Sequence, residues 1–201
     1  MIKLNIGCAS RPLKDYINID IDNLSTLKKR YPGKKFDENL KIENFDIFNL
    51  PYESFSVDEV RADGLIEHLS FLEEPRFFNE VSRVLKKNGI LQLTTIDFEK
   101  LVKQWLEAPD DWKDFFKNDK KSIEENHWFG TYTYSPINRW GYLTASIFGS
   151  QNGEGQFHKN CYTKKKFEAI CKKINFKILE LNEKKWKGDR DHIIELIAAK
   201  L

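Results

Sequence analysis

The chain has 201 residues, with 33 Lys plus Arg against 31 Asp plus Glu, so its formal net charge is +2. This near-neutral balance disfavours nucleic acid as the main partner, because phosphate binding calls for a clear excess of basic residues. Hydrophobic residues make up 40% and aromatic residues 13% of the chain, which supplies a sizeable core and excludes a mainly disordered protein. We expect a single domain over residues 1–201.

Targeting and metal signals are missing from the sequence. No apolar run reaches the roughly 18 residues that a membrane helix needs, and residues 1–6 lack the basic-then-apolar pattern of a signal peptide. We therefore expect a cytoplasmic protein. The three cysteines form no Cys-x-x-Cys pair, and the four histidines show no zinc-ligand spacing. The sequence thus predicts neither a disulfide scaffold nor a metal site.

The first hundred residues alternate short strand-like runs with turns and amphipathic stretches, the pattern of a parallel α/β sheet. The expected strands cover residues 2–6, 16–21, 41–47, 57–63 and 90–96. A helix before the last of these has an apolar face that runs from Phe78 to Leu85, and Asn88-Gly89 is its predicted stop signal.

The second half begins with a helix whose apolar residues run from Phe98 to Leu106. An aromatic-rich insertion follows at about 108–152, and regular patterning resumes with a helix that starts near Thr163. Strands at 176–181 and 192–199 are joined by a charged, tight connection. We interpret them as a hairpin, which places one antiparallel strand in an otherwise parallel sheet.

Three residues, each at the end of one of three successive strands, favour a ligand site. Gly7 and the small residues after it let the backbone approach a ligand at the carboxyl edge of the sheet. Asp20 ends the second strand, where an acid can accept hydrogen bonds from both hydroxyls of a ribose. Asp46 ends the third and could accept from an adenine amine. Either acid alone is more typical of a turn.

Several segments match one family in its own order. They are residues 4–9, 16–20, 46–52, 54–60, 67–69 and 83–89, with a further match at 155–162. The most specific is Arg83-Val84-Leu85-Lys86-x-x-Gly89. On these segments the chain resembles the class I S-adenosylmethionine-dependent methyltransferases, in particular small bacterial members associated with glycans or small molecules.

The resemblance implies a Rossmann-like, mostly parallel seven-stranded sheet with a C-terminal antiparallel strand, and S-adenosylmethionine as the cofactor. It also implies methyl transfer to an oxygen or nitrogen of a small-molecule or glycan acceptor. Gly7 would approach the methionine end of the donor, Ile21 would pack on the adenine, and Asp46 with the backbone of Ile47 would read the adenine edge. The residues assigned to the donor site are Gly7, Cys8, Ala9, Asp20, Ile21, Asp46, Ile47 and Asp63.

Two departures from the family pattern keep alternatives open. Ala9 stands where a second glycine is usual, and the span from Gly7 to Asp20 is too short for a crossover helix. We expect an extended loop or a single turn there. A non-catalytic module that binds an S-adenosyl ligand is therefore one alternative, and an RNA or protein methyltransferase of the same fold is the other.

On the acceptor side, His158 lies in a polar segment and is the candidate general base, because a neutral imidazole suits proton removal near neutral pH. The alternative is a histidine that stabilises its loop. Trp128, Tyr132 and Tyr134 in the insertion, together with Lys159, are the candidate acceptor contacts. The insertion is interpreted either as a lid that stacks on the acceptor or as a small core of its own.

Overall fold

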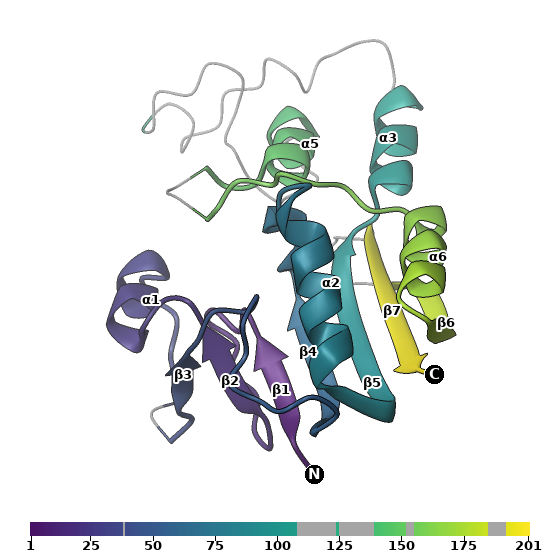
Figure 1. Ribbon diagram of the computed structural model, residues 1–201. Helices are drawn as coiled ribbons and strands as arrows, with labels where there is room; N and C mark the ends of the chain where they lie inside the picture. Colours follow the sequence, from purple (N-terminus) through teal and green to yellow (C-terminus); the bar gives the residue numbers. More distant parts are fainter. Residues whose placement is uncertain (38, 108–123, 125–138, 152–154, 185–191) are drawn as a thin grey trace.

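A seven-stranded sheet with helices around it organises the chain (Figure 1). The computed structural model describes residues 1–37, 39–107, 124, 139–151, 155–184 and 192–201. The strands are β1 Lys3–Ile6, β2 Ile17–Asp20, β3 Ile42–Asn44, β4 Val57–Asp63, β5 Leu85–Ile96, β6 Phe176–Lys184 and β7 Ile193–Lys200. The helices are α1 Leu24–Arg30, the 3₁₀ turn η1 Ile66–His68, α2 Glu73–Val84, α3 Phe98–Leu106, α5 Arg139–Phe148 and α6 Lys164–Lys173. None of the helices in these ranges is long and apolar enough to span a bilayer.

The strand order is β3-β2-β1-β4-β5-β7-β6. The pairs from β3 to β5 are all parallel, whereas β7 runs antiparallel to both of its neighbours. The predicted α/β fold with one antiparallel strand is confirmed. The order reverses between β1 and β4, and in open sheets such a switch point is where ligands bind.

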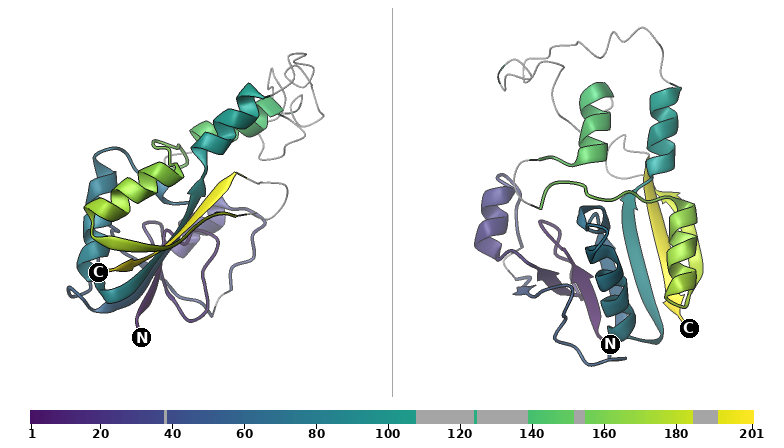
Figure 2. Two further views of the ribbon diagram at one scale, coloured as in Figure 1. Left: turned by 90° about the vertical axis from the view of Figure 1, so that its right-hand side faces the viewer. Right: turned by 45° about the horizontal axis from the view of Figure 1, so that its top comes forward.

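One face of the sheet carries the main core. Leu4, Val60 and Leu91 occupy adjoining register positions on β1, β4 and β5 and are fully buried. Helices α2 and α6 lie on the same side of the sheet and cover this face (Figure 2). Their apolar residues, including Val81 and Phe167, join the same buried cluster. Burial of this surface is the main force that holds these helices to the sheet.

The opposite face is polar. Lys3 on β1 pairs with Glu59 on β4 at 2.8 Å, and Arg61 donates to Gln92 on β5 at 3.3 Å. Gln92 in turn donates to Glu195 on β7 at 2.9 Å. Residues 7–16 alone join β1 to β2, which is too short for the helix that usually covers such a connection. These cross-strand pairs satisfy the side chains that face outward here.

Several strand boundaries differ from the prediction, and β6, expected to end at residue 181, extends to Lys184. The assignment of Leu85 to the helix face is wrong, since α2 ends at Val84 and Leu85 pairs with Val57 as the first residue of β5. Asn88, whose φ is +63°, and Gly89 lie inside β5, where the register against β4 shifts, and do not end the helix. Strand β3 stops at Asn44, short of Asp46. Helix α1, which Asn23 caps, was not predicted.

The insertion predicted at about 108–152 falls largely outside the described residues. Its described part includes α5, which stands beside α3 beyond the carboxyl end of β5 (Figure 1). Leu143 of α5 and Leu101 of α3 are buried together in a small second cluster. Other predictions about the insertion stay predictions.

The contacts of Arg83 give a structural role to the segment that matches the family most specifically. The Arg83 guanidinium donates to the backbone oxygens of Tyr52 at 2.7 Å and Leu50 at 3.0 Å, and to both carboxylate oxygens of Glu80. Glu80, which is buried, also accepts from the backbone N–H of Leu50 at 2.6 Å. The pair thus fastens the loop before β4 to α2.

We expect Arg83→Ala to lower the free energy of unfolding by about 2–3 kcal/mol, because it removes charge-assisted hydrogen bonds and leaves a buried carboxylate without its cation. Urea denaturation measures this loss. Lys87→Ala, at an exposed position in the same segment, is the control and should change stability by less than about 0.5 kcal/mol. Equal effects of the two changes would contradict the role given to Arg83.

Candidate functional site

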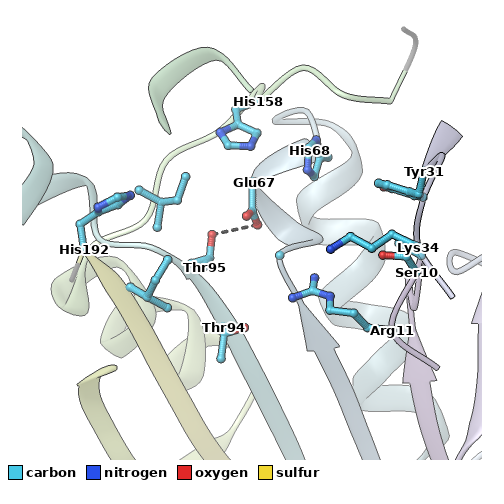
Figure 3. Close-up of a pocket in the computed structure, with 14 residues that line it drawn as sticks. Ser10, Arg11, Tyr31, Lys34, Glu67, His68, Thr94, Thr95, His158 and His192 are labelled. Atoms are coloured by element: carbon cyan, nitrogen blue, oxygen red, sulfur yellow. Dashed lines mark hydrogen bonds between the residues drawn. The ribbon is translucent and has the colours of Figure 1, made fainter. Parts of the chain in front are cut away.

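A cavity of about 310 Å³ opens at the carboxyl ends of β1, β4 and β5, at the switch point of the sheet (Figure 3). The chain segments that line it come from the loop after β1, the segment after α1, η1, the end of β5, the loop before α6 and the start of β7. Its lining residues are Ala9, Ser10, Arg11, Tyr31, Lys34, Gly64, Glu67, His68, Thr94, Thr95, Ile96, His158, His192 and Ile193.

The loop after β1 turns sharply at Gly7, whose φ is +63°. A Cβ atom at this position would lie 2.7 Å from the side chain of Leu65, so only glycine fits without a rearrangement. Ala9 also has a left-handed backbone, with a φ of +45°. Glycine, the usual residue of the family at this position, adopts such a φ more readily. The turn brings Ala9 and Arg11 to the cavity wall.

Asp20 holds this loop in place. One of its carboxylate oxygens accepts from the backbone N–H of Ala9 at 2.8 Å, and the other accepts from that of Asp22 at 3.0 Å. Burial raises the pKa of Asp20, and these two hydrogen bonds oppose the rise. The carboxylate that was assigned to the ribose therefore also fixes the backbone that would meet the donor.

The remaining residues assigned to the donor are not among those that line this cavity. Cys8 is buried, and burial raises the pKa of its thiol to about 12. The side chain of Ile21 is exposed, and that of Asp46 is exposed and accepts from the backbone N–H of Phe48. Ile47 packs against the main core. Asp63 accepts from Thr94 and Arg61 on the polar face.

Glu67, His68 and His158 meet at the other end of the cavity (Figure 3). One possible ligand atom from each lies within 4.8 Å of those of the other two, and the imidazole rings meet edge to face with centroids 4.8 Å apart. Glu67 accepts from the Thr95 hydroxyl at 2.9 Å. We name these three residues the Glu-His-His cluster. The segment Glu67-His68-Leu69 was a family match, but the sequence assigned it no role at the site.

Backbone hydrogen bonds fix which ring nitrogen of each histidine in the cluster donates. Nδ1 of His68 lies 3.0 Å from the Phe157 carbonyl oxygen, and Nδ1 of His158 lies 2.9 Å from that of Ser146. Since a carbonyl oxygen only accepts, each Nδ1 carries a proton, so in the neutral form of either ring Nε2 is the nitrogen with the lone pair. Burial lowers the pKa of His158, against the opposing effect of Glu67, which favours the neutral ring.

The segment around His158 is fastened to η1 by main-chain contacts. The backbone N–H groups of Lys159 and Asn160 both donate to the Glu67 carbonyl oxygen, at 2.8 and 3.1 Å. The hydroxyl of Tyr162 donates to the Ile66 carbonyl oxygen at 3.3 Å. This segment therefore positions His158 against Glu67. The Lys159 side chain lies 3.8 Å from Glu73 in an ion pair.

A second cavity of about 240 Å³ adjoins the first and shares Glu67, Thr95, Ile96 and His158 with it. Aromatic side chains supply much of its own lining: Phe71, Phe98, Phe148 and Tyr162. Trp128, Tyr132 and Tyr134, which were assigned to the acceptor, lie outside the described residues. Lys159 does line this second cavity.

Residues 4–93 match the family model described as a methyltransferase domain. A search of curated proteins found no match. Among solved structures, a S-adenosylmethionine-dependent methyltransferase from Methanosarcina mazei is similar at 19% identity and a TM-score of 0.57, covering 99% of this chain and 92% of that one. A putative enzyme of the same description from Listeria monocytogenes has 16% identity and a TM-score of 0.55, covering 100% and 91%.

A third similar structure is the 1,6-didemethyltoxoflavin-N1-methyltransferase of Burkholderia thailandensis, which holds 1,6-didemethyltoxoflavin and S-adenosylhomocysteine. It has 9% identity and a TM-score of 0.56 and covers 99% of this chain and 70% of that one. At these identities the structures establish the fold, and the family model establishes the methyltransferase domain. Residues 4–93 carry the methyltransferase domain, and the predicted resemblance to class I S-adenosylmethionine-dependent methyltransferases, the enzyme class and the cofactor are confirmed.

The left-handed Ala9 generates a stability prediction. Ala9→Gly should raise the free energy of unfolding by about 0.5–1 kcal/mol, because the left-handed region strains alanine by more than the entropy that glycine loses. Chemical denaturation measures the gain. Ala62→Gly in the buried centre of β4 is the matched control and should lower stability. A loss of stability in Ala9→Gly would contradict the strain.

A second prediction tests Asp20 as a ligand of the donor. Asp20→Ala should weaken the binding of S-adenosylhomocysteine roughly 10-fold to 150-fold, since hydrogen bonds to a charged group are worth roughly 1.5–3 kcal/mol. Asp46→Ala should weaken binding less, because the backbone near Ile47 remains available to the adenine. Calorimetric titration compares the two, and an unchanged affinity in Asp20→Ala would rule out the assignment.

Proposed function

We propose that this methyltransferase acts on a hydroxyl or amine of a small-molecule or glycan acceptor, with the donor in the first cavity and the acceptor in the second. The observation that carries the proposal is the common wall of the two cavities. Glu67, Thr95 and His158 border both, so a methyl group on one side has a short path to a nucleophile on the other. In-line displacement requires this kind of juxtaposition.

The residues of the first cavity suit S-adenosylmethionine. The donor supplies a methyl group on a positively charged sulfur. Arg11 and Lys34 line the same cavity and carry charge that complements the donor carboxylate. Gly7 gives the backbone close approach, and Asp20 both fixes that backbone and keeps acceptor capacity for a ribose hydroxyl. Ile21, Asp46, Ile47 and Asp63 are proposed to contribute to the adenosine side of the site.

His158 is the proposed proton acceptor. Its Nδ1 is committed to the Ser146 carbonyl oxygen, which leaves Nε2 as the nitrogen that can take a proton from an acceptor hydroxyl. The neutral ring that burial favours is the form a general base needs. The fixed Nδ1 contact also holds the ring in one orientation. For a neutral amine acceptor, positioning alone would suffice, and His158 would matter less.

The second cavity supports an acceptor with a planar or apolar surface. Its aromatic lining can stack on a ring, whether that of a sugar or of a planar heterocycle. Trp128, Tyr132 and Tyr134 are proposed to extend this surface, and Lys159 to contact the acceptor at its rim. The near-neutral net charge gives no support to an RNA acceptor.

We expect His158→Ala to lower turnover roughly 100-fold to 10,000-fold, the range that a positioned acid or base contributes. Calorimetry with S-adenosylhomocysteine should give unchanged donor affinity. Turnover equal to that of the wild type would reject a role in the reaction. Loss of donor affinity as well would show that His158 shapes the pocket.

The function itself is tested with a donor that carries a labelled methyl group. The protein is incubated with this donor and with fractionated metabolite and glycan extracts. The expected result is label in a small-molecule or glycan fraction together with released S-adenosylhomocysteine. Label that appears only in added RNA or protein would support the alternative enzyme. Retention of the donor without transfer in any fraction would support the binding module.

A further inference from the structure

We propose that the Glu-His-His cluster is a binding site for one divalent transition-metal cation, with Glu67 as the oxygen ligand and His68 and His158 as the nitrogen ligands. The sequence showed no metal-ligand spacing, because the ligands come from two segments far apart in the chain. Glu67 and His68 are neighbours in the sequence, whereas His158 follows Phe157, which is 89 positions after His68. The fold unites them on η1 and the loop before α6 (Figure 3).

The first argument is the burial of Glu67. This residue is only 6% exposed, and its carboxylate accepts a hydrogen bond from Thr95. The salt bridges among the described residues join Glu67 to neither lysine nor arginine, and the Arg11 guanidinium, which lines the same cavity, donates to the Asp63 carbonyl oxygen. A buried carboxylate is costly unless a cation compensates its charge. By contrast Glu80, which is buried to a similar degree, is neutralised by Arg83.

The second argument is the state of the two imidazoles. A histidine that binds a metal donates its other ring nitrogen to a carbonyl or carboxylate, which fixes the tautomer and the orientation of the ring. Both His68 and His158 make this contact through Nδ1, to the carbonyl oxygens of Phe157 and Ser146. The Nδ1 atoms of both rings are thus engaged as expected of metal ligands, and the Nε2 atoms are the ones that a cation would use.

The third argument is spacing. The possible ligand atoms of the cluster lie within 4.8 Å of one another. With ligand distances of about 2.0–2.2 Å, donor atoms on opposite sides of one cation lie about 4.4 Å apart, and neighbouring donors lie closer. Small side-chain rotations would therefore close the set. The backbone contacts of Lys159 and Asn160 to the Glu67 carbonyl keep the two segments together while this happens.

The donor set indicates the class of cation. Two imidazoles and one carboxylate favour Zn²⁺, Fe²⁺, Co²⁺ or Mn²⁺ over Mg²⁺ and Ca²⁺, which prefer oxygen ligands only. Three protein ligands leave further coordination positions. Because Glu67 and His158 border both cavities, these positions face the place proposed for the acceptor, and a hydroxyl or a pair of neighbouring hydroxyls is the chemistry that would fill them.

The contact between the cation and an acceptor hydroxyl rests on the proposed function, whereas binding of the cation does not. In the cation-bound protein His158 is a ligand, so the role of free base proposed for it applies to the cation-free protein. Cation binding needs neither donor nor acceptor. It can therefore be measured separately from methyl transfer.

The experiment uses the full chain, freed of metal by dialysis against a chelator and titrated with Zn²⁺ and with Co²⁺. Calorimetry should give one site per chain, and bound Co²⁺ should show the visible absorption of a site with nitrogen ligands. Glu67→Gln and His68→Asn should each weaken binding by about 100-fold or more, since even groups outside the metal's own ligands are worth 10-fold to 100-fold. Glu73→Gln, which removes a nearby carboxylate that pairs with Lys159, should leave affinity within about twofold.

Folding of each variant is checked by its circular dichroism spectrum and by the midpoint of its urea denaturation. Glu67→Gln preserves the shape of the side chain and its contact with Thr95, so it keeps the test valid if the histidine variant fails to fold. Binding that is absent, or that persists unchanged in Glu67→Gln and His68→Asn, would overturn the site. Failure of methyl transfer with intact cation binding would instead count against the proposed function alone.

Discussion

The short connection between β1 and β2 is the constraint on which the site depends. Parallel neighbours normally need a helix between them, yet here residues 7–16 suffice. With no helix to anchor the loop, side chains take over. Asp20 holds the backbone of Ala9, and Asn18 accepts from Asn5 and from the backbone N–H of Leu13. The buried polar residues at the ends of these strands therefore replace the packing that a helix would give.

The same constraint accounts for the polar face of the sheet. A crossover helix would require apolar side chains at the outward positions of β1 and β4. Instead Lys3, Glu59 and Arg61 stand there and pair across the strands. Such pairs contribute little stability when exposed, so the fold relies on the other face, where α2 and α6 bury the main core. The first cavity lies at the edge of the sheet that the carboxyl ends of β1, β4 and β5 form.

Elements with strong local signals were predictable. The Thr163 cap and the apolar face beyond it give α6. The short charged segment between two strand-like runs predicted a hairpin, and β6 and β7 do pair antiparallel. The boundary at Leu85 was not predictable, because an apolar residue at that spacing suits a helix and a strand equally, and only pairing with Val57 decides between them. Asn23 is a good cap signal, but α1 has little apolar periodicity to extend it.

The candidate site likewise has a part that the sequence could predict and a part that it could not. Gly7 and Asp20 stand at strand ends, so the topology of the sheet brings them together and a sequence pattern can find them. The Glu-His-His cluster depends on contacts between η1 and a loop far along the chain. These contacts are made by backbone groups, which every residue type has. The Glu67 carbonyl accepts from Lys159 and Asn160, and no residue type in the sequence records that contact.

Electrostatics connects the two cavities. Both the sulfonium of the donor and the proposed divalent cation would be attracted to the buried carboxylate of Glu67, which borders the cavities proposed for the donor and the acceptor. Methyl transfer removes the positive charge from sulfur, so the attraction of Glu67 for the sulfonium weakens toward the transition state, which opposes the reaction. A bound cation would repel the sulfonium, and this repulsion would weaken in the same way, which favours the reaction. Only such differences between the two states affect the chemical step, and the low-dielectric position of Glu67 increases both of them. Binding of the cation would therefore offset the cost of placing a buried carboxylate beside the sulfonium.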